Sequence, residues 1–340
     1  MRMTAAGVLL VAAIGFWAAA QSTLKTDVDL VSMYFTVRDS KGGLVTNLEK
    51  DAFKVFEDGQ PQTISFFARH SDVPMNVGVL LDVSTSLSRT LGLEADAASH
   101  FFRSVMRAND FGFLVSYASR IQTLQVPIDD ADRLAEKAQT IRRDGHLDDL
   151  TPAFPQGSTQ RFPFPVPSRI PSSVPDLTSL RVARLYDAVG FSVDRFLHHE
   201  VGRKALVIVA LADDAKSESS LREALRSLKE SDVIAYVMEV EHAPRARRDD
   251  CDIRHIFRNE PDGRIARLAE ETGGRVIKVE GFEKMQAAFD QIADELHQQY
   301  SLGYRPTNQN WDSSFRKVVI QAGRGYKISA RDGYFATRRN

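Results

Sequence analysis

The stretch that decides the fold reads Val77-Gly78-Val79-Leu80-Leu81-Asp82-Val83-Ser84-Thr85-Ser86. Its first five residues form a short continuous apolar run, which is typical of a strand buried on both faces of a parallel sheet. The polar residues that follow lead into Leu93 to Met106, where apolar residues recur at helical spacing. The pattern therefore predicts a buried strand, a polar turn and a helix.

The same alternation continues through the middle of the chain. Further strands are expected at 111–117, 205–210, 233–240 and 275–279, and further helices at 131–142, 185–197, 219–228, 264–271 and 283–298. Alternation of this kind predicts a doubly wound, mostly parallel α/β sheet with right-handed crossovers. We place this domain at residues 74–296.

The two flanks of the α/β region have antiparallel β character. The dipeptide Asp58-Gly59 lies between 53–57 and 62–67 and favours a tight hairpin. Further strand-like stretches occupy 28–38, 300–304, 315–322 and 326–330. Each flank is too short to bury a good core alone. We therefore expect residues 22–72 and 297–340 to be β segments that pair into one β domain.

The first 20 residues have the composition of a secretory signal peptide. Arg2 precedes an apolar run from Thr4 to Trp17, and Ala18-Ala19-Ala20 before Gln21 forms a small-residue cleavage site. The alternative is an uncleaved anchor, but the run is shorter than the roughly 20 residues of a membrane span. No later segment is long and apolar enough to cross a membrane. We therefore expect an exported protein, either periplasmic or secreted.

Composition excludes several classes of function. The 44 Lys and Arg residues nearly balance the 45 Asp and Glu residues, so no broad positive surface favours nucleic acid or an anionic membrane. The single cysteine, Cys251, cannot form an intrachain disulfide. A hydrophobic content of 43% is sufficient for a sizeable core, so stability must come from packing.

Residues 144–178 interrupt the alternation. Seven prolines crowd into this segment at positions 152, 155, 163, 165, 167, 171 and 175, and prolines at that density prevent regular helix or strand ladders. A long loop inside a domain either binds something or is mobile, and we favour the mobile interpretation.

The turn that follows the first buried strand contains candidate ligands for a divalent metal ion. Asp82, Ser84 and Ser86 supply one carboxylate and two hydroxyls, which are hard oxygen donors suited to Mg²⁺ or Mn²⁺. The carboxyl ends of strands are where ligands bind in open α/β sheets. Ser and Asp also cap helices, so the motif alone is a weak signal, and its position after a buried strand strengthens it.

Several segments together resemble the von Willebrand factor type A family, and more closely a bacterial exported subfamily. The segments are 27–31, 53–59 with 62–67, the Asp82 motif, Leu185-Tyr186-Asp187-Ala188-Val189, Arg203-Lys204-Ala205-Leu206-Val207 and Tyr300-Ser301-Leu302-Gly303-Tyr304. The resemblance covers nearly the whole chain after residue 20. It implies a protein-interaction or adhesion module that binds a protein or a cell-surface ligand.

The resemblance also implies a metal-ion-dependent adhesion site built from three loops, of which only the first is intact. The family's threonine falls on Ala183 and its later aspartate falls on Leu211. Thr178 and Asp213 are close enough in sequence to substitute only if the loops shift. We therefore expect a degenerate site with Asp82, Ser84, Ser86 and Asp213 as candidate metal ligands, or a surface that functions without metal.

Other candidate sites are weaker. His198-His199-Glu200 is read as a solvated helix end, because adjacent residues point in different directions. Asp249-Asp250-Cys251-Asp252 with His255 lies in a charged loop without paired metal-ligand spacing. An enzyme is not expected, since the Gly-x-Ser-x-Gly and phosphate-loop patterns are absent. The alternatives are a metal-free scaffold component and a hydrolase that uses Asp82 or Ser84.

Overall fold

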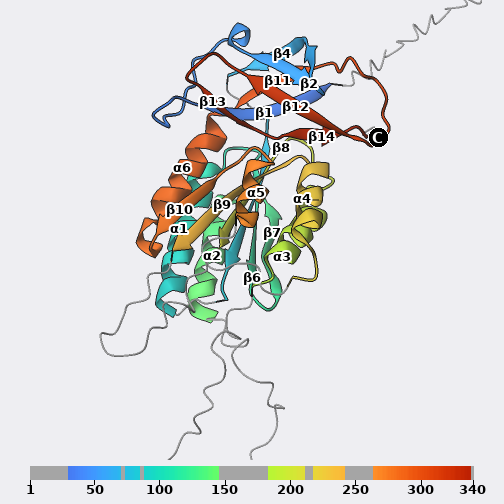
Figure 1. Ribbon diagram of the computed structural model, residues 1–340. Helices are drawn as coiled ribbons and strands as arrows, with labels where there is room; N and C mark the ends of the chain where they lie inside the picture. Colours follow the sequence, from blue (N-terminus) through green and yellow to red (C-terminus); the bar gives the residue numbers. More distant parts are fainter. Residues whose placement is uncertain are drawn as a thin grey trace, which may run out of the picture.

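The computed structural model describes residues 30–69, 73–84, 88–144, 183–210, 217–241 and 263–337. An α/β domain lies below a smaller β domain in Figure 1. The predicted signal peptide and the proline-rich insertion after Asp144 lie outside the described residues.

A six-stranded sheet with the order β10-β9-β8-β5-β6-β7 forms the centre of the α/β domain. The strands are β5 (Met75–Asp82), β6 (Phe111–Tyr117), β7 (Ile121–Ile128), β8 (Arg203–Ala210), β9 (Val233–Glu241) and β10 (Val276–Glu280). All neighbouring pairs are parallel except β6 and β7. This confirms the predicted doubly wound, mostly parallel fold class. The antiparallel edge strand β7 was not predicted.

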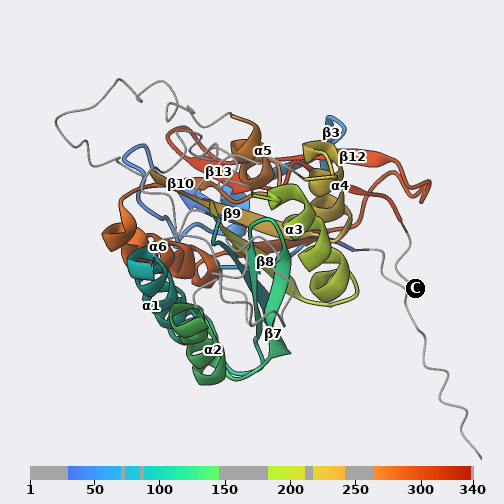
Figure 2. The same ribbon diagram turned by 90° about the horizontal axis from the view of Figure 1, so that it is seen from below.

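Helices cover both faces of this sheet (Figure 2). One face packs against α1 (Ser88–Val105), α2 (Ala131–Asp144) and α6 (Met285–His297), which follows the short turn Phe282–Lys284. The other face packs against α3 (Leu185–Ser192) with its π-helical extension Val193–Leu197, α4 (Leu221–Glu230) and α5 (Arg264–Glu270). Because strand residues alternate between faces, Leu80 packs with the α3 layer and Leu81 with the α1 layer.

The central strand β5 is buried along its whole length. Its glycine, Gly78, is explained by close packing, since a Cβ added there would lie 2.1 Å from the ring of Phe113 on β6. Full burial of such a ring contributes about 1.5–3 kcal/mol. The Val-Gly-Val pattern therefore admits an aromatic side chain from the neighbouring strand directly over the backbone of β5.

Two four-stranded sheets form the β domain, with the orders β13-β1-β11-β4 and β14-β12-β2-β3. The strands are β1 (Val31–Arg38), β2 (Lys54–Glu57), β3 (Gln60–Gln62), β4 (Ile64–Ala68), β11 (Tyr300–Tyr304), β12 (Phe315–Gln321), β13 (Lys327–Ala330) and β14 (Gly333–Phe335), with a 3-10 turn at Lys50–Ala52. Strand β1 lies between β11 and β13, and β2 pairs with β12. Both sheets therefore combine residues from the two flanks of the chain.

The hairpin after β2 differs in part from the sequence expectation. Asp58 and Gly59 both adopt positive φ, at 48° and 82°, as a tight hairpin turn requires. Pairing with β2 ends at Gln62, however, and β4 continues into the other sheet beside β11. The predicted return strand 62–67 is thus divided between two sheets.

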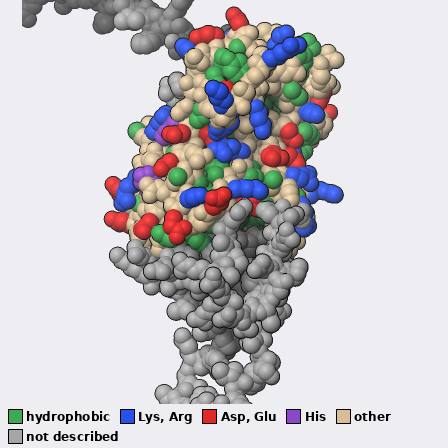
Figure 3. All heavy atoms as spheres, turned by 60° about the vertical axis from the view of Figure 1, so that its left-hand side comes forward, with side chains coloured by type: hydrophobic (Ala, Val, Ile, Leu, Met, Phe, Trp, Pro, Cys, Tyr) green, Lys and Arg blue, Asp and Glu red, His purple; other side chains and the backbone are tan. Residues whose placement is uncertain are grey.

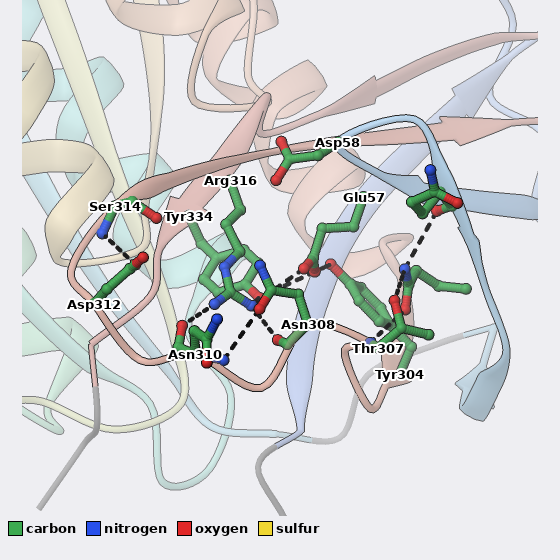
Figure 4. Close-up of polar contacts among 12 residues, drawn as sticks. Glu57, Asp58, Tyr304, Thr307, Asn308, Asn310, Asp312, Ser314, Arg316 and Tyr334 are labelled. Carbon is green, nitrogen blue, oxygen red and sulfur yellow. Dashed lines mark hydrogen bonds and ion pairs between the residues drawn. The ribbon is translucent and has the colours of Figure 1, made fainter.

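A buried polar network joins the two sheets of the β domain (Figure 4). The Glu57 carboxylate accepts hydrogen bonds from the hydroxyls of Tyr304 and Tyr334, at 2.8 and 3.0 Å, and pairs with Arg316 at 3.3 Å. The Arg316 guanidinium also donates to the carbonyl oxygens of Asn308 and Asn310. Burial raises the pKa of Tyr304, and the neighbouring carboxylate raises that pKa further. The network therefore holds the 308–310 loop against β12.

The β domain covers the amino ends of the parallel strands. Arg203, at the start of β8, donates to the carbonyl oxygens of Val73 and Leu296 at 3.0 and 2.6 Å. Lys229 at the end of α4 pairs with Asp332 of the β domain at 2.9 Å. The carboxyl ends of the same strands lie at the opposite end of the molecule (Figure 1).

Candidate functional site

Asp82 is the last residue of β5, and its side chain is fully buried at the carboxyl end of the sheet. It lies on the same face as Leu80, toward α3, because strand residues two apart share a face. The backbone N–H of Ser84 donates to Asp82 Oδ1 at 2.9 Å, and the N–H of Val83 donates to the carbonyl oxygen of Tyr117 at 2.9 Å. These bonds turn the chain sharply after β5 and fix Asp82 at its end.

The hydroxyl of Ser84 is buried beside this carboxylate. Among the described residues its Oγ has no hydrogen-bond partner. An unpaired buried polar group costs about 1–3 kcal/mol, so it calls for a ligand, a water molecule or a further loop to complete its bonding. Ser84 is therefore the residue of the predicted site that most clearly requires a partner.

The segment before α3 returns to the same edge of the sheet. The backbone N–H of Arg184 donates to the carbonyl oxygen of Ala118, just beyond β6, at 3.2 Å. Ala183 is fully buried and belongs to the same core cluster as Leu80 and Tyr117. The position onto which the family's threonine falls therefore carries a buried methyl group and has no side-chain oxygen for a metal.

Tyr117 spans the ends of three strands at this edge. It is fully buried at the end of β6, and its hydroxyl donates to the carbonyl oxygen of Val209 on β8 at 2.9 Å. Strand β5 lies between these two strands, so the phenol ring crosses its carboxyl end on the face that carries Asp82. The sequence analysis missed Tyr117, because only the sheet order reveals that it reaches across β5.

Asp187 joins the start of α3 to the chain that leads into α4. Its carboxylate accepts the backbone N–H groups of Ser219 and Glu218, at 2.8 and 3.0 Å, and pairs with Arg184 at 2.8 Å. Burial alone would raise the pKa of Asp187, but the N–H bonds from Ser219 and Glu218 and the Arg184 guanidinium hold that pKa below its usual range. Asp187 belongs to a segment that carries the family resemblance, yet sequence reasoning gave it no role.

The other positions discussed for the predicted site fall outside the part of the chain that the structure describes. Ser86, Asp213, Leu211 and Thr178 lie outside the described residues, as does the cluster Asp249-Asp250-Cys251-Asp252 with His255. His198, His199 and Glu200 are exposed at the end of the α3 segment, and His198 Nδ1 lies 2.9 Å from Ser231 Oγ.

The described residues supply only part of the ligand set that a metal ion would need. Asp82 and Ser84 offer two oxygen donors, whereas Mg²⁺ requires six ligands in near-ideal octahedral geometry. No group of three or more His, Cys, Asp or Glu side chains suited to a metal occurs in the described part of the chain. A metal held by Asp82 and Ser84 would therefore need further ligands, from water or from residues outside the described ranges.

Two further observations concern the described residues as a whole. No described helix combines the length and apolarity that crossing a membrane requires. Positive and negative side chains are interspersed over the face in Figure 3.

Comparisons with known proteins give only distant structural likenesses. No family model and no curated protein matches the sequence. Among solved structures, proximal thread matrix protein 1 from the mussel byssus is 11% identical with a TM-score of 0.45, over 71% of this chain and 50% of that one. Another structure of that mussel protein is described with a zinc-occupied MIDAS motif.

Two bacterial structures are similar at the same level. BatB from Bacteroides thetaiotaomicron is 14% identical with a TM-score of 0.41, over 65% of this chain and 98% of that one. An aerotolerance-related membrane protein from Bacteroides fragilis is 16% identical with a TM-score of 0.40, over 65% of this chain and 100% of that one. The chain thus spans about half the length of the mussel protein, and its fold assignment follows from its own sheet order and helix layers.

Proposed function

We propose that this chain is an exported, non-catalytic interaction module of the von Willebrand factor A type. It binds a protein or cell-surface ligand at the carboxyl ends of β5, β6 and β8. The observation that carries this proposal is that one turn contains both a buried carboxylate, Asp82, and a buried hydroxyl, that of Ser84. The Ser84 hydroxyl has no hydrogen-bond partner among the described residues. Both belong to a turn at the edge of the sheet where ligands of open α/β folds bind.

The same turn is proposed to hold a divalent ion weakly, as a degenerate adhesion site. Asp82, Ser84, Ser86 and Asp213 would supply hard oxygen ligands to Mg²⁺ or Mn²⁺. Bound there, the ion would supply a positive centre for an oxygen of the partner. The methyl group of Ala183 and the leucine at 211 remove two of the family's donors, so the affinity should be lower than for a complete site.

Calorimetric titration of Mg²⁺ and Mn²⁺ into the chelator-treated protein tests this proposal. We expect saturable binding that Asp82→Ala abolishes. Asp110→Asn is the matched control, because Asp110 is also buried but lies at the opposite end of the sheet, where it accepts N–H bonds from Met75 and Arg107. Absence of binding in the unmodified protein would instead support a metal-free scaffold component.

Ala183→Ser tests the same proposal in the opposite direction, because it should raise the affinity for Mn²⁺. Ala183 is fully buried in the core cluster that contains Leu80 and Tyr117, so adding one oxygen should cost about 1 kcal/mol of stability. It would also restore a hydroxyl at the position where the resemblance expects one. We expect roughly tenfold tighter Mn²⁺ binding, which is about 1.4 kcal/mol. An unchanged affinity would argue against Ala183 as a metal-facing position.

A hydrolase remains the second alternative, with Ser84 as its nucleophile. Within the described residues Ser84 has no hydrogen bond to a histidine, which such a nucleophile would need for activation. Turnover of an ester substrate that Ser84→Ala abolished would establish this alternative.

A further inference from the structure

The three described sheets end in six edge strands, and five of these strands carry features that discourage pairing with another chain. Charged side chains, proline, bulges and short length are the usual protections. Strand β13 has an exposed lysine, β10 has an exposed lysine and an exposed glutamate, and β3 contains a proline. Strand β7 contains a proline and two register shifts, and β14 is only three residues long.

Strand β4, at the top of the β domain in Figure 1, is the exception. Its sequence Ile64-Ser65-Phe66-Phe67-Ala68 contains no charged residue and no proline. Its single register shift lies at its start, so Phe66 to Ala68 pair regularly with β11, and no described strand lies on its other side. A regular, uncharged edge presents a row of backbone N–H and C=O groups to any strand that approaches it.

The outer face of the sheet at this edge is apolar. Phe66 is 52% exposed and lies opposite Gly303 of β11. Leu30, which is 38% exposed, lies over Gly303 from the side of β1, because a Cβ at Gly303 would be 2.7 Å from the Leu30 side chain. Leu30 and Phe66 therefore flank the bare backbone of Gly303 and form one apolar strip that ends at the free edge. A contiguous strip marks an interaction surface, whereas exposed apolar side chains that are scattered singly do not.

The distribution of charge around β4 favours a second copy of this chain as the occupant. Antiparallel pairing of two β4 strands about a two-fold axis at Phe66 brings the two exposed phenyl rings together across the axis. The same register places Arg69 of each copy opposite Thr63 of the other copy, so no like charges meet. Arg69 also pairs with Glu49 of its own chain at 3.1 Å. The net charge of the whole chain is only −1, so repulsion between two copies is small.

We propose that β4 is the interface of a symmetric dimer, in which two sheets of the order β13-β1-β11-β4 join into one continuous antiparallel sheet. The two-fold axis closes the assembly, because it uses the β4 edge of both copies. One strand edge and one apolar strip form a small interface, so the dimer is weak and depends on protein concentration. The interface lies in the β domain, whereas the proposed interaction site lies at the far end of the α/β domain (Figure 1).

Sedimentation equilibrium over a range of protein concentrations provides the first test. We expect a reversible monomer–dimer equilibrium with a Kd of about 10–100 μM. Phe66→Lys should raise this Kd about tenfold or more, because it places two like charges opposite one another. Val319→Lys is the matched control: Val319 is 38% exposed but lies on β12, an inner strand of the other sheet, so the Kd should not change. A protein that stays monomeric at every concentration, or an equal Kd for the two variants, would overturn the proposal.

Disulfide trapping gives a second test, which locates the contact. The chain has one cysteine, so Cys251→Ser provides a background without thiols. Phe66→Cys in that background should form a covalent dimer on mild oxidation, because residues directly opposite one another across an antiparallel pair are close enough for a disulfide. Val319→Cys in the same background should remain uncrosslinked. A dimer that forms in solution but is not trapped through position 66, or is trapped equally through position 319, would show that β4 is not its interface.

Discussion

The two ends of the central sheet differ in whether their buried polar groups have partners. At the amino end, the β domain lies over the strands, and charged side chains such as Arg203 and Glu295 are buried among partners from both domains. At the carboxyl end, the Ser84 hydroxyl is buried without a partner among the described residues, and Ala183 offers only a methyl group. The difference separates an end that is closed by contacts between the two domains from the end at which we propose that a ligand binds.

The largest expected effect is at the amino end. Glu295→Gln leaves Arg38 and Arg275 beside a neutral amide, and breaking a buried pair of this kind costs about 2–4 kcal/mol after allowance for the partial exposure of the two arginines. Urea denaturation measures the loss. Glu280→Gln is the control, because its pair with Lys284 is exposed and should contribute far less to stability. Equal losses in both variants would contradict a special role for the amino end.

Asp187→Asn should lower the free energy of unfolding by an intermediate amount, about 1–2 kcal/mol at pH 7. The reason is that the amide accepts the backbone N–H hydrogen bonds of Ser219 and Glu218 more weakly than the carboxylate does. The pKa of Asp187 is lowered by folding, so its stabilisation is fully present above the unfolded pKa of about 3.9 and is lost as the pH falls through the folded value. The difference from the unmodified protein should therefore shrink in acid.

Urea denaturation between pH 2 and pH 7 follows this difference directly. Asp132→Asn serves as the comparison, because the Asp132 side chain is largely exposed in its pair with Arg103 and should change stability by less than about 0.5 kcal/mol. A pH-independent loss for Asp187→Asn would mean that its charge does not stabilise the fold.

The smallest change in the free energy of unfolding is expected for Ser84→Ala. Unlike the same substitution at a hydrogen-bonded buried serine, it should not destabilise the fold. The Ser99 hydroxyl on α1 lies within hydrogen-bonding distance of the carbonyl oxygens of Ala95 and Ala135, at 2.7 and 2.8 Å, so Ser99→Ala should destabilise by about 1 kcal/mol. Ser84→Ala removes a hydroxyl that has no described partner and should be neutral or stabilising by up to about 0.5–1 kcal/mol in chelator. Thermal unfolding distinguishes them, and equal losses would mean that Ser84 is bonded within the fold.

The sequence predicted the fold where local pattern and tertiary position agree. The continuous apolar run of β5 and the helical spacing of α1 are both consequences of burial, so both were recognisable. Strand β7 was missed because it is a half-buried edge strand that contains Gln122, Gln125 and Pro127, and these residues obscure the strand pattern. The return strand after Gly59 was misassigned because a crossing between sheets leaves no local signal.

The candidate site was predictable only in its first loop. Asp82 follows a recognisable buried strand, and its position at the strand end could be inferred from that alone. Tyr117 and Asp187 act through contacts with Val209 and Ser219, which are distant in the sequence. Such contacts depend on the strand order, which periodicity does not encode.

The position of β1 between β11 and β13 has a consequence for the order of folding. A chain that emerges from its amino end makes β1 first, yet both partner strands of β1 are among the last segments to appear. Pairing between strands that are far apart in the sequence is slow. Strand edges that are still unpaired during this time are prone to aggregation. The α/β domain can therefore assemble before the β domain does, and the early strands need protection until the chain is complete.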